Sequence, residues 1–149
     1  MQKITIDRKA LKACALFAAK KDIRHYLNGV LVESTPLETR IVGCDGHTLG
    51  VHRSDAKGDN LGVFTGIIPL DAVNAILKWK SPVRSDDIPV TLTAQDNGEI
   101  RADYCGQSII FRWIDGRFPD YRRVIPAELN GEKAFFNPYY LIRLRDASK

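Results

Sequence analysis

The stretch DGRFPDYRRVIP, residues 115–126, is the most informative segment of this sequence. It places three arginines, two aromatic residues and two prolines within twelve residues. Proline fixes the backbone φ angle and lacks an N–H donor, and the residue before each proline is restricted to extended conformations. The pattern predicts an extended connector that Phe118 and Tyr121 anchor on a folded unit. A second interpretation is that Phe118, Tyr121 and Trp113 stack on the bases of single-stranded nucleic acid.

The residues before the connector form two similar series of predicted elements. Alternation and helical spacing of apolar residues predict strands at 4–6, 26–33, 39–44 and 47–52 with a helix at 8–21, and then strands at 63–69, 90–94, 99–104 and 108–113 with a helix at 70–80. Asp45-Gly46 is typical of a two-residue hairpin turn, and residues 54–62 are typical of a loop. The order strand, helix, three strands occurs twice, which indicates an internal βαβββ repeat. We expect an α+β fold with both helices on one face of a continuous antiparallel sheet.

A third series begins after the connector. Residues 133–136 are predicted as a strand, and Asn137-Pro138 is a typical helix start because Asn caps and Pro suits the first helical position. The predicted helix runs to Lys149 with neither Gly nor Pro to end it. We therefore expect residues 129–149 to be the opening of a further, truncated unit.

Composition is that of an ordinary globular protein. The 149 residues suffice for a domain with a core, and 44% are hydrophobic and 27% charged, as is typical. No apolar run is long enough for a transmembrane helix, and residues 1–7 alternate like a strand and do not resemble a signal peptide. Cys14, Cys44 and Cys105 are odd in number and widely spaced, which favours reduced thiols in the cytoplasm over a disulfide framework.

No set of residues indicates catalysis, a metal or a cofactor. Cys44, His47 and His52 are residue types that bind zinc, but a fourth ligand is missing and one hairpin would direct the three apart. No glycine-rich phosphate loop precedes a helix, and there is no nucleophile elbow. We therefore expect a non-enzymatic protein without metal or cofactor.

Positive charge is concentrated at the N-terminus. Residues 1–24 contain seven lysines and arginines against two aspartates, a net charge of +5, whereas the whole chain carries +4. Lys9, Lys12 and Lys20 fall on one stripe of the predicted helix, opposite its apolar stripe. This pattern favours contact with a polyanion; the alternative is a solvated helix face.

Two further segments accompany the connector, YLNGVL at residues 26–31 and CDGHTL at residues 44–49. Together the three segments closely resemble the bacterial DNA polymerase III β subunits, the family of sliding clamps. The resemblance implies the DNA clamp fold, in which two βαβββ repeats make a domain with helices inside and sheet outside. In this family three domains make a subunit and two subunits close a ring around duplex DNA. Residues 1–128 resemble the central domain, and residues 129–149 the first strand and helix of the next.

The implied function is that of a processivity factor, which tethers polymerase to duplex DNA in the cytoplasm, with no membrane involved. Lysines and arginines on the helices of a ring bind phosphates without reading base sequence. The residues expected to contact DNA are Lys9, Lys12, Lys20, Lys21, Arg24, Tyr26, Asn74 and Lys78.

The family also has an apolar pocket that receives short linear peptides of polymerases, the clamp loader and repair proteins. The matching positions are Leu27, Cys44, Gly46, His47, Thr48, Leu49 and Pro126. Cys44 and Thr48 stand where the family often has threonine and arginine. The residues alone also fit a simpler interpretation, in which Leu27 and Leu49 are core and Asp45-Gly46 is only a turn.

Two other functions remain as alternatives. The first is a clamp-derived interaction module, of phage or mobile-element origin, that keeps the peptide pocket but does not encircle DNA. The second is a basic protein that binds single strands.

Overall fold

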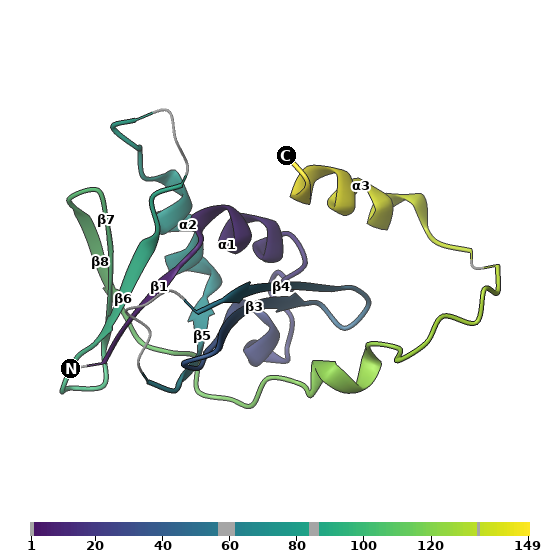
Figure 1. Cartoon of the computed structure of the whole chain (residues 1–149), viewed down its shortest axis with the longest axis horizontal. Helices are drawn as coiled ribbons and strands as arrows, with labels where there is room; N and C mark the ends of the chain where they lie inside the picture. Colours follow the sequence, from purple (N-terminus) through teal and green to yellow (C-terminus); the bar gives the residue numbers. More distant parts are fainter. Residues whose placement is uncertain (1, 57–61, 84–86, 134) are drawn as a thin grey trace.

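The computed structural model describes residues 2–56, 62–83, 87–133 and 135–149. Two series of elements follow one another along the chain (Figure 1). The first is β1 (Lys3–Ile6), α1 (Arg8–Ala15), β2 (Gly29–Ser34), β3 (Glu38–Cys44) and β4 (Leu49–Asp55), and the second is β5 (Phe64–Pro69), α2 (Leu70–Lys78), β6 (Val90–Ala94), β7 (Ile100–Tyr104) and β8 (Gln107–Phe111). The predicted βαβββ repeat is confirmed.

The two series exchange their first strands. β1 lies at the edge of one sheet, in the order β1-β6-β7-β8, and β5 lies at the edge of the other, in the order β4-β3-β2-β5. All pairs are antiparallel. The prediction of a continuous sheet is therefore wrong, because the strands form two four-stranded sheets. Figure 1 shows these sheets turned at an angle to one another around the helices.

The main core lies between the helix pair and the two sheets. α1 contacts α2 and packs on β2, β3 and β4, whereas α2 packs on β2, β5 and β8. Each helix contributes one apolar stripe to this core. Burial of apolar surface stabilises the fold by about 25 cal/mol per Å². The buried residues come from both series and include Ile4, Ile6, Leu11, Cys14, Val30, Val32, Ile68, Val73, Ile76, Val90 and Leu92.

Helix α1 begins at a side-chain cap. The Asp7 carboxylate accepts hydrogen bonds from the backbone N–H groups of Lys9, at 2.7 Å, and Ala10, at 3.2 Å, as an N-cap residue does. The helix ends at Ala15, well before the predicted end at Lys21. Residues 17–19 are all buried, and three consecutive residues cannot lie on one stripe of a helix, so the chain turns inward here.

Close approach of backbones holds α1 on its sheet. A Cβ atom at Gly43 would lie 2.0 Å from the carbonyl oxygen of Cys14, and one at Gly50 would lie 2.5 Å from the ring of Phe17. Cys14 Sγ is 3.2 Å from the carbonyl oxygen of Ile41, and burial raises the pKa of this thiol to about 12. Cys14, Cys44 and Cys105 are all free thiols.

Several predicted boundaries move. Residues His25–Leu27 form a 3₁₀ turn, η1, so β2 starts later than the predicted residue 26. A four-residue loop, residues 45–48, replaces the two-residue hairpin between β3 and β4. Residues 54 and 55 of the predicted loop belong to β4, and residues 57–61 lie outside the described residues.

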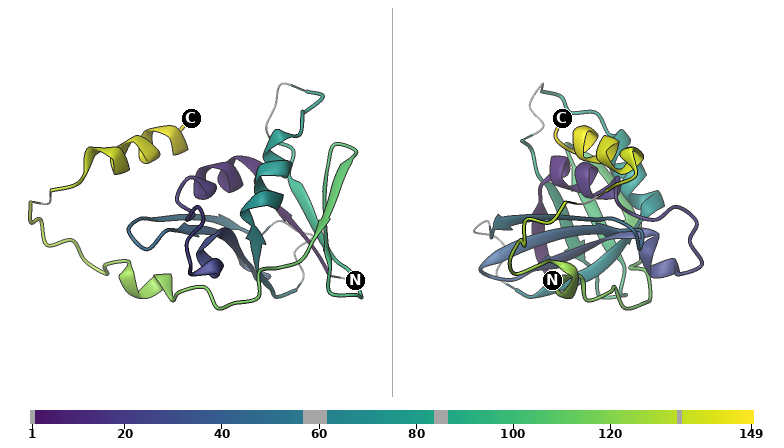
Figure 2. Two further views of the ribbon diagram at one scale, coloured as in Figure 1. Left: turned by 180° about the vertical axis from the view of Figure 1, so that it is seen from behind. Right: turned by 90° about the vertical axis from the view of Figure 1, so that its right-hand side faces the viewer.

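The C-terminal segment contains a second 3₁₀ turn, η2 (Tyr121–Val124), and a helix, α3 (Pro138–Ala147). Asn137 caps α3 by accepting from the N–H of Tyr139 at 3.0 Å, as the sequence predicted. The strand predicted at residues 133–136 is wrong for Lys133, Phe135 and Phe136, which are irregular and exposed, while Ala134 lies outside the described residues. No strand in the described part of the chain pairs with them. Helix α3 returns to lie near α1 (Figure 2).

None of the helices in the part of the chain that the structure describes has the length and apolar composition required to span a bilayer.

Candidate peptide-binding cavity and DNA-binding face

The connector crosses the outer face of the sheet β4-β3-β2-β5. Tyr121 is only 3% exposed and forms a second apolar cluster with Leu31, Val42 and Ile67; Phe118 packs against this cluster. The Tyr121 hydroxyl donates to the Glu33 carboxylate at 2.6 Å. The predicted anchoring of the connector is confirmed, and a buried Tyr121 ring is not available to stack on bases.

Trp113 is also engaged within the domain. Its indole packs edge-on against Phe64 and Phe111, at ring-centroid distances of 5.4 and 5.5 Å. A Cβ atom at Gly66 would lie 2.4 Å from the indole, so the ring lies directly on the backbone of β5. This packing fixes the point at which the connector leaves β8.

An apolar cavity of about 240 Å³ lies where three separate segments meet. Tyr26 and Leu27 come from η1, Cys44 and Leu49 from the ends of β3 and β4, and the connector closes the far side. Concave, mostly apolar sites with a few polar groups are typical ligand sites. The complete lining is Arg24, Tyr26, Leu27, Cys44, Gly46, Leu49, Pro119, Asp120, Tyr121 and Val124.

Four of the seven residues predicted to bind peptide line this cavity, namely Leu27, Cys44, Gly46 and Leu49. Pro126 does not: it is exposed and lies beyond η2. Pro119 and Val124, which the sequence prediction missed, occupy the wall of the cavity. Both flank the buried Tyr121, so the position of the anchoring ring was the signal that could have identified them.

Loop 45–48 is organised by one carboxylate. Asp45 Oδ1 accepts from the N–H of His47 at 2.9 Å, the N–H of Thr48 at 2.7 Å and the hydroxyl of Thr48 at 3.0 Å. Gly46 has a φ of +86°, a conformation that glycine adopts without strain. The loop therefore has a defined shape and presents Gly46 to the cavity.

His47 and Thr48 lie on the other side of this loop, and with Leu49 they line a second cavity of about 280 Å³. Its opposite wall comes from Tyr140, Leu141 and Leu144 of α3 and from Phe136, which precedes this helix. Leu49 lines both cavities. The seven predicted peptide-binding residues are thus divided between two adjacent cavities and, for Pro126, neither.

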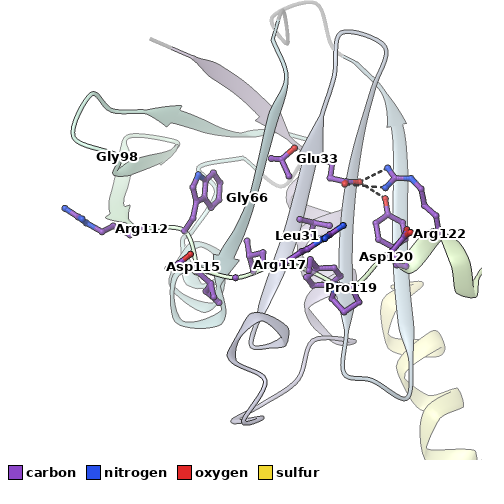
Figure 3. Close-up of a pocket in the computed structure, with 17 residues that line it drawn as sticks. Leu31, Glu33, Gly66, Gly98, Arg112, Asp115, Arg117, Pro119, Asp120 and Arg122 are labelled. Carbon is purple, nitrogen blue, oxygen red and sulfur yellow. Dashed lines mark hydrogen bonds and ion pairs between the residues drawn. The ribbon is translucent and has the colours of Figure 1, made fainter.

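A larger cavity, about 700 Å³, lies on the same outer face between β5 and the connector (Figure 3). Arg117 lies over Leu31 at its centre, and Arg122 reaches Glu33 at its rim. The Arg122 guanidinium donates to the Glu33 carboxylate at 2.8 Å, and this ion pair raises the pKa of Arg122. Arg122 therefore acts with Tyr121 to hold the connector on β2.

The predicted DNA-binding residues separate into two groups. Lys9 and Lys12 on α1, and Asn74 and Lys78 on α2, are exposed on neighbouring helices. The Lys9 ammonium lies 3.4 Å from the Asp87 carboxylate, and both groups are largely exposed; such pairs contribute little. Because α1 contacts α2, these four exposed side chains lie on adjacent helices, and we call them the helix face.

The other four predicted residues lie elsewhere. Lys20 and Lys21 follow the end of α1, and Lys21 has a φ of +58°, so the prediction that Lys20 continues the helical stripe is wrong. Arg24 and Tyr26 line the 240 Å³ cavity. Arg24 donates to Asp22 at 2.8 and 3.0 Å, and this side-chain hydrogen bonding lowers the pKa of Asp22 to about 2.

The residues considered as metal ligands remain separate. Cys44 ends β3, His47 is in the loop and His52 is within β4. Across residues 2–56, 62–83, 87–133 and 135–149, no group of three or more His, Cys, Asp or Glu side chains is arranged to hold a metal ion.

Comparison with known proteins identifies the family. Residues 5–120 match the family described as DNA polymerase III beta subunit, central domain. The chain is 34% identical over 119 residues to the beta sliding clamp of Escherichia coli K12, covering 80% of this chain and 31% of that protein. It is 33% identical over 108 residues to that of Vibrio cholerae, covering 72% and 28%.

Solved structures agree. The DNA polymerase III subunit beta of Pseudomonas aeruginosa superimposes with a TM-score of 0.70 at 27% identity, covering 86% of this chain and 35% of that one. The beta subunit of Thermotoga maritima gives a TM-score of 0.68 at 23% identity, covering 85% and 34%, which supports the fold. The chain spans about a third of the length of these relatives. It belongs to the bacterial DNA polymerase III β-subunit family, the sliding clamps, and contains that family's central domain.

Proposed function

We propose that this chain serves in a sliding clamp, a non-catalytic factor that holds polymerase on duplex DNA in the bacterial cytoplasm. The observation that carries the proposal is the 240 Å³ apolar cavity. Its walls come from η1, loop 45–48 and the connector, which are the three segments that carry the family resemblance. A cavity of this size accommodates one or two apolar side chains of an extended peptide.

The ligands of this cavity are short linear peptides of polymerases, the clamp loader and repair proteins. Leu27, Leu49 and Val124 supply apolar wall, and Arg24 and Asp120 supply polar groups at the edge. His47 and Thr48 contact the peptide from the α3 side of the loop, and Pro126 contacts it beyond η2. Each apolar side chain that the peptide buries adds about 1.5–3 kcal/mol of gross stabilisation.

The duplex lies against α1 and α2. Lys9, Lys12 and Lys78 contact phosphates, and Asn74 donates a hydrogen bond. Lys20 and Lys21 add positive charge after the end of α1, whereas Arg24 and Tyr26 line the apolar cavity. Residues 1–128 act as one clamp domain and residues 129–149 as the start of the next. Encirclement of DNA requires a homo-oligomeric ring of subunits with the length of the relatives, about three times that of this chain.

One observation favours the alternative of an interaction module that does not encircle DNA. Four of the eight expected DNA contacts lie off the helix face, two of them on the peptide cavity. The salt dependence of duplex binding separates the two functions, because only the clamp requires the cations on α1 and α2.

The test is a fluorescence-anisotropy titration of the chain with a labelled peptide that has the sequence of the clamp-binding tail of a bacterial replicative polymerase. A peptide of the same composition in scrambled order is the control. We expect saturable binding of the first peptide only. Equal binding of the two peptides, or of neither, contradicts the proposal.

A further inference from the structure

Helix α3 is fastened to loop 45–48 by one arginine. The Arg143 guanidinium donates to Asp45 Oδ2 at 2.5 Å and to the Thr48 hydroxyl at 2.8 Å, across nearly a hundred residues of sequence. The Arg143 side chain is 33% exposed and that of Asp45 only 12%. The Tyr140 ring lies 5.5 Å from the guanidinium carbon. Charge-assisted hydrogen bonds in so sheltered a place are stronger than those at an open surface.

Asp45 links loop 45–48 to helix α3, because each of its two carboxylate oxygens binds one of them. Oδ1 holds the backbone of loop 45–48 through His47 and Thr48, and Oδ2 receives Arg143. Burial alone would raise the pKa of this carboxyl, but the hydrogen bonds from Arg143, His47 and Thr48 hold it at about 2. The carboxylate is thus charged throughout the neutral range, and a movement of α3 pulls directly on the loop.

The loop forms part of the wall of the peptide cavity. Gly46 lines the 240 Å³ cavity, and Leu49 directly follows the loop and lines both this cavity and the one against α3. Tyr140 and Leu144 form the α3 side of the second cavity. A shift of the loop therefore changes the shape of the peptide cavity, although Arg143 itself is not in its lining.

We propose that Arg143 is a positioning residue for the peptide cavity: it fixes loop 45–48 through Asp45 and Thr48, and peptide binding in turn strengthens the docking of α3. The proposal rests on the proposed peptide-binding function. Coupling between two equilibria is reciprocal. If the contact of Arg143 with loop 45–48 strengthens peptide binding, then bound peptide must strengthen this contact by the same factor.

Three variants of the full chain test this role. Arg143→Met keeps most of the side-chain length and removes the charge. Arg145→Met is the matched control, because Arg145 lies on the same helix but pairs only with its neighbour Asp146 among the described residues. Asp45→Asn keeps an oxygen that can accept from His47 and Thr48 and removes the negative charge that binds Arg143.

Peptide affinity is measured by anisotropy with the labelled polymerase-tail peptide. We expect Arg143→Met and Asp45→Asn each to weaken binding about three- to tenfold, a part of what a hydrogen bond to a charged group is worth, and Arg145→Met to leave it unchanged. A double variant that combines Arg143→Met with Asp45→Asn should lose no more peptide affinity than either single variant, because the effects of residues that act through one contact are not additive.

Hydrogen exchange gives the reciprocal measurement. Bound peptide should slow exchange of the α3 amides in the wild type and in Arg145→Met, but not in Arg143→Met. If Arg143 only stabilised α3, the α3 amides of Arg143→Met would exchange faster than those of the wild type, but bound peptide would still slow this exchange. Wild-type affinity in both single variants, or additive losses in the double variant, overturns the inference and leaves the peptide site intact. Failure of the wild type to bind the peptide overturns the proposed function and the inference together.

Discussion

The hydroxyl of Tyr121 donates a 2.6 Å hydrogen bond to the carboxylate of Glu33, and this contact joins the connector to strand β2 near its C-terminal end. The same turn, η2, contributes Tyr121 and Val124 to the peptide cavity. The wall of a candidate binding site is therefore held in place by a sheet residue that lies outside its lining.

Removing that hydroxyl should cost stability. We expect Tyr121→Phe to lower the free energy of unfolding by about 1 kcal/mol, the usual net value of one hydrogen bond, because the ring stays buried while Glu33 keeps its bonds to Arg122. Urea titration of both proteins measures this difference. Tyr139→Phe, at a position that is 74% exposed, is the control and should unfold at the wild-type midpoint. An equal effect of the two substitutions would remove the role assigned to the Tyr121–Glu33 bond.

Closing the cavity at the loop should prevent peptide binding. In Gly46→Leu the new side chain meets the Arg24 guanidinium, only 2.9 Å from the Cβ position, and fills space that the peptide needs. Loss of one buried apolar side chain, about 2 kcal/mol, corresponds to about thirtyfold weaker binding.

Gly106→Leu is the control for this substitution. Gly106 has a φ of +78°, against +86° at Gly46, and a Cβ atom there meets nothing within 4 Å, so the backbone strain is matched without obstruction. Isothermal titration with the polymerase-tail peptide should show wild-type affinity for Gly106→Leu. Similar losses in the two variants would indicate strain and not occlusion.

The cationic helix face should dominate the salt dependence of duplex binding. Replacing Lys9, Lys12 and Lys78 together by alanine should lower the slope of log K against log salt concentration by up to about 0.9 for each lysine, since each phosphate contact releases counterions. The control replaces Arg53 of β4, Arg101 of β7 and Arg112, which directly follows β8, with the same change in charge. If both triple variants lose the same slope, binding depends on net charge alone and α1 and α2 do not form the DNA face.

Acid should release α3 from loop 45–48 at low pH. The pKa of Asp45 is lowered from 3.8 to about 2 in the folded protein, so its contribution to stability is fully present above pH 4 and is lost as pH falls through 2. Asp45→Asn should remove this part of the pH dependence between pH 4 and 2. Amide exchange of α3 across that range is the measurement, and an identical pH profile in the variant would contradict the prediction.

The order of elements and much of the candidate cavity could be predicted from the sequence, because they depend on local signals. Alternation, helical spacing and the caps at Asp7 and Asn137 are properties of neighbouring residues. The resemblance at residues 26–31 and 44–49 likewise located four of the cavity residues. The exchange of β1 and β5 between the sheets is a long-range pairing, and no local pattern specifies it.

The errors have the same origin. Lys20 continues the helical stripe in sequence, but the buried residues 17–19 end the helix before it. Pro126 and Pro119 are equally plausible walls by residue type, and only the insertion of Tyr121 decides between them. The contact of Arg143 with Asp45 joins residues 98 positions apart, and the sequence of α3 contains no signal for it.

The central claim is that the cavity between η1, loop 45–48 and the connector is the peptide site, and nuclear magnetic resonance of the ¹⁵N-labelled chain tests it most directly. On titration with the polymerase-tail peptide, the account predicts the largest amide shifts at Leu27, Cys44, Leu49 and Val124, with the amides of Lys9 and Lys78 unchanged. Shifts confined to α1 and α2, or no shifts with a peptide that binds by anisotropy, would contradict it.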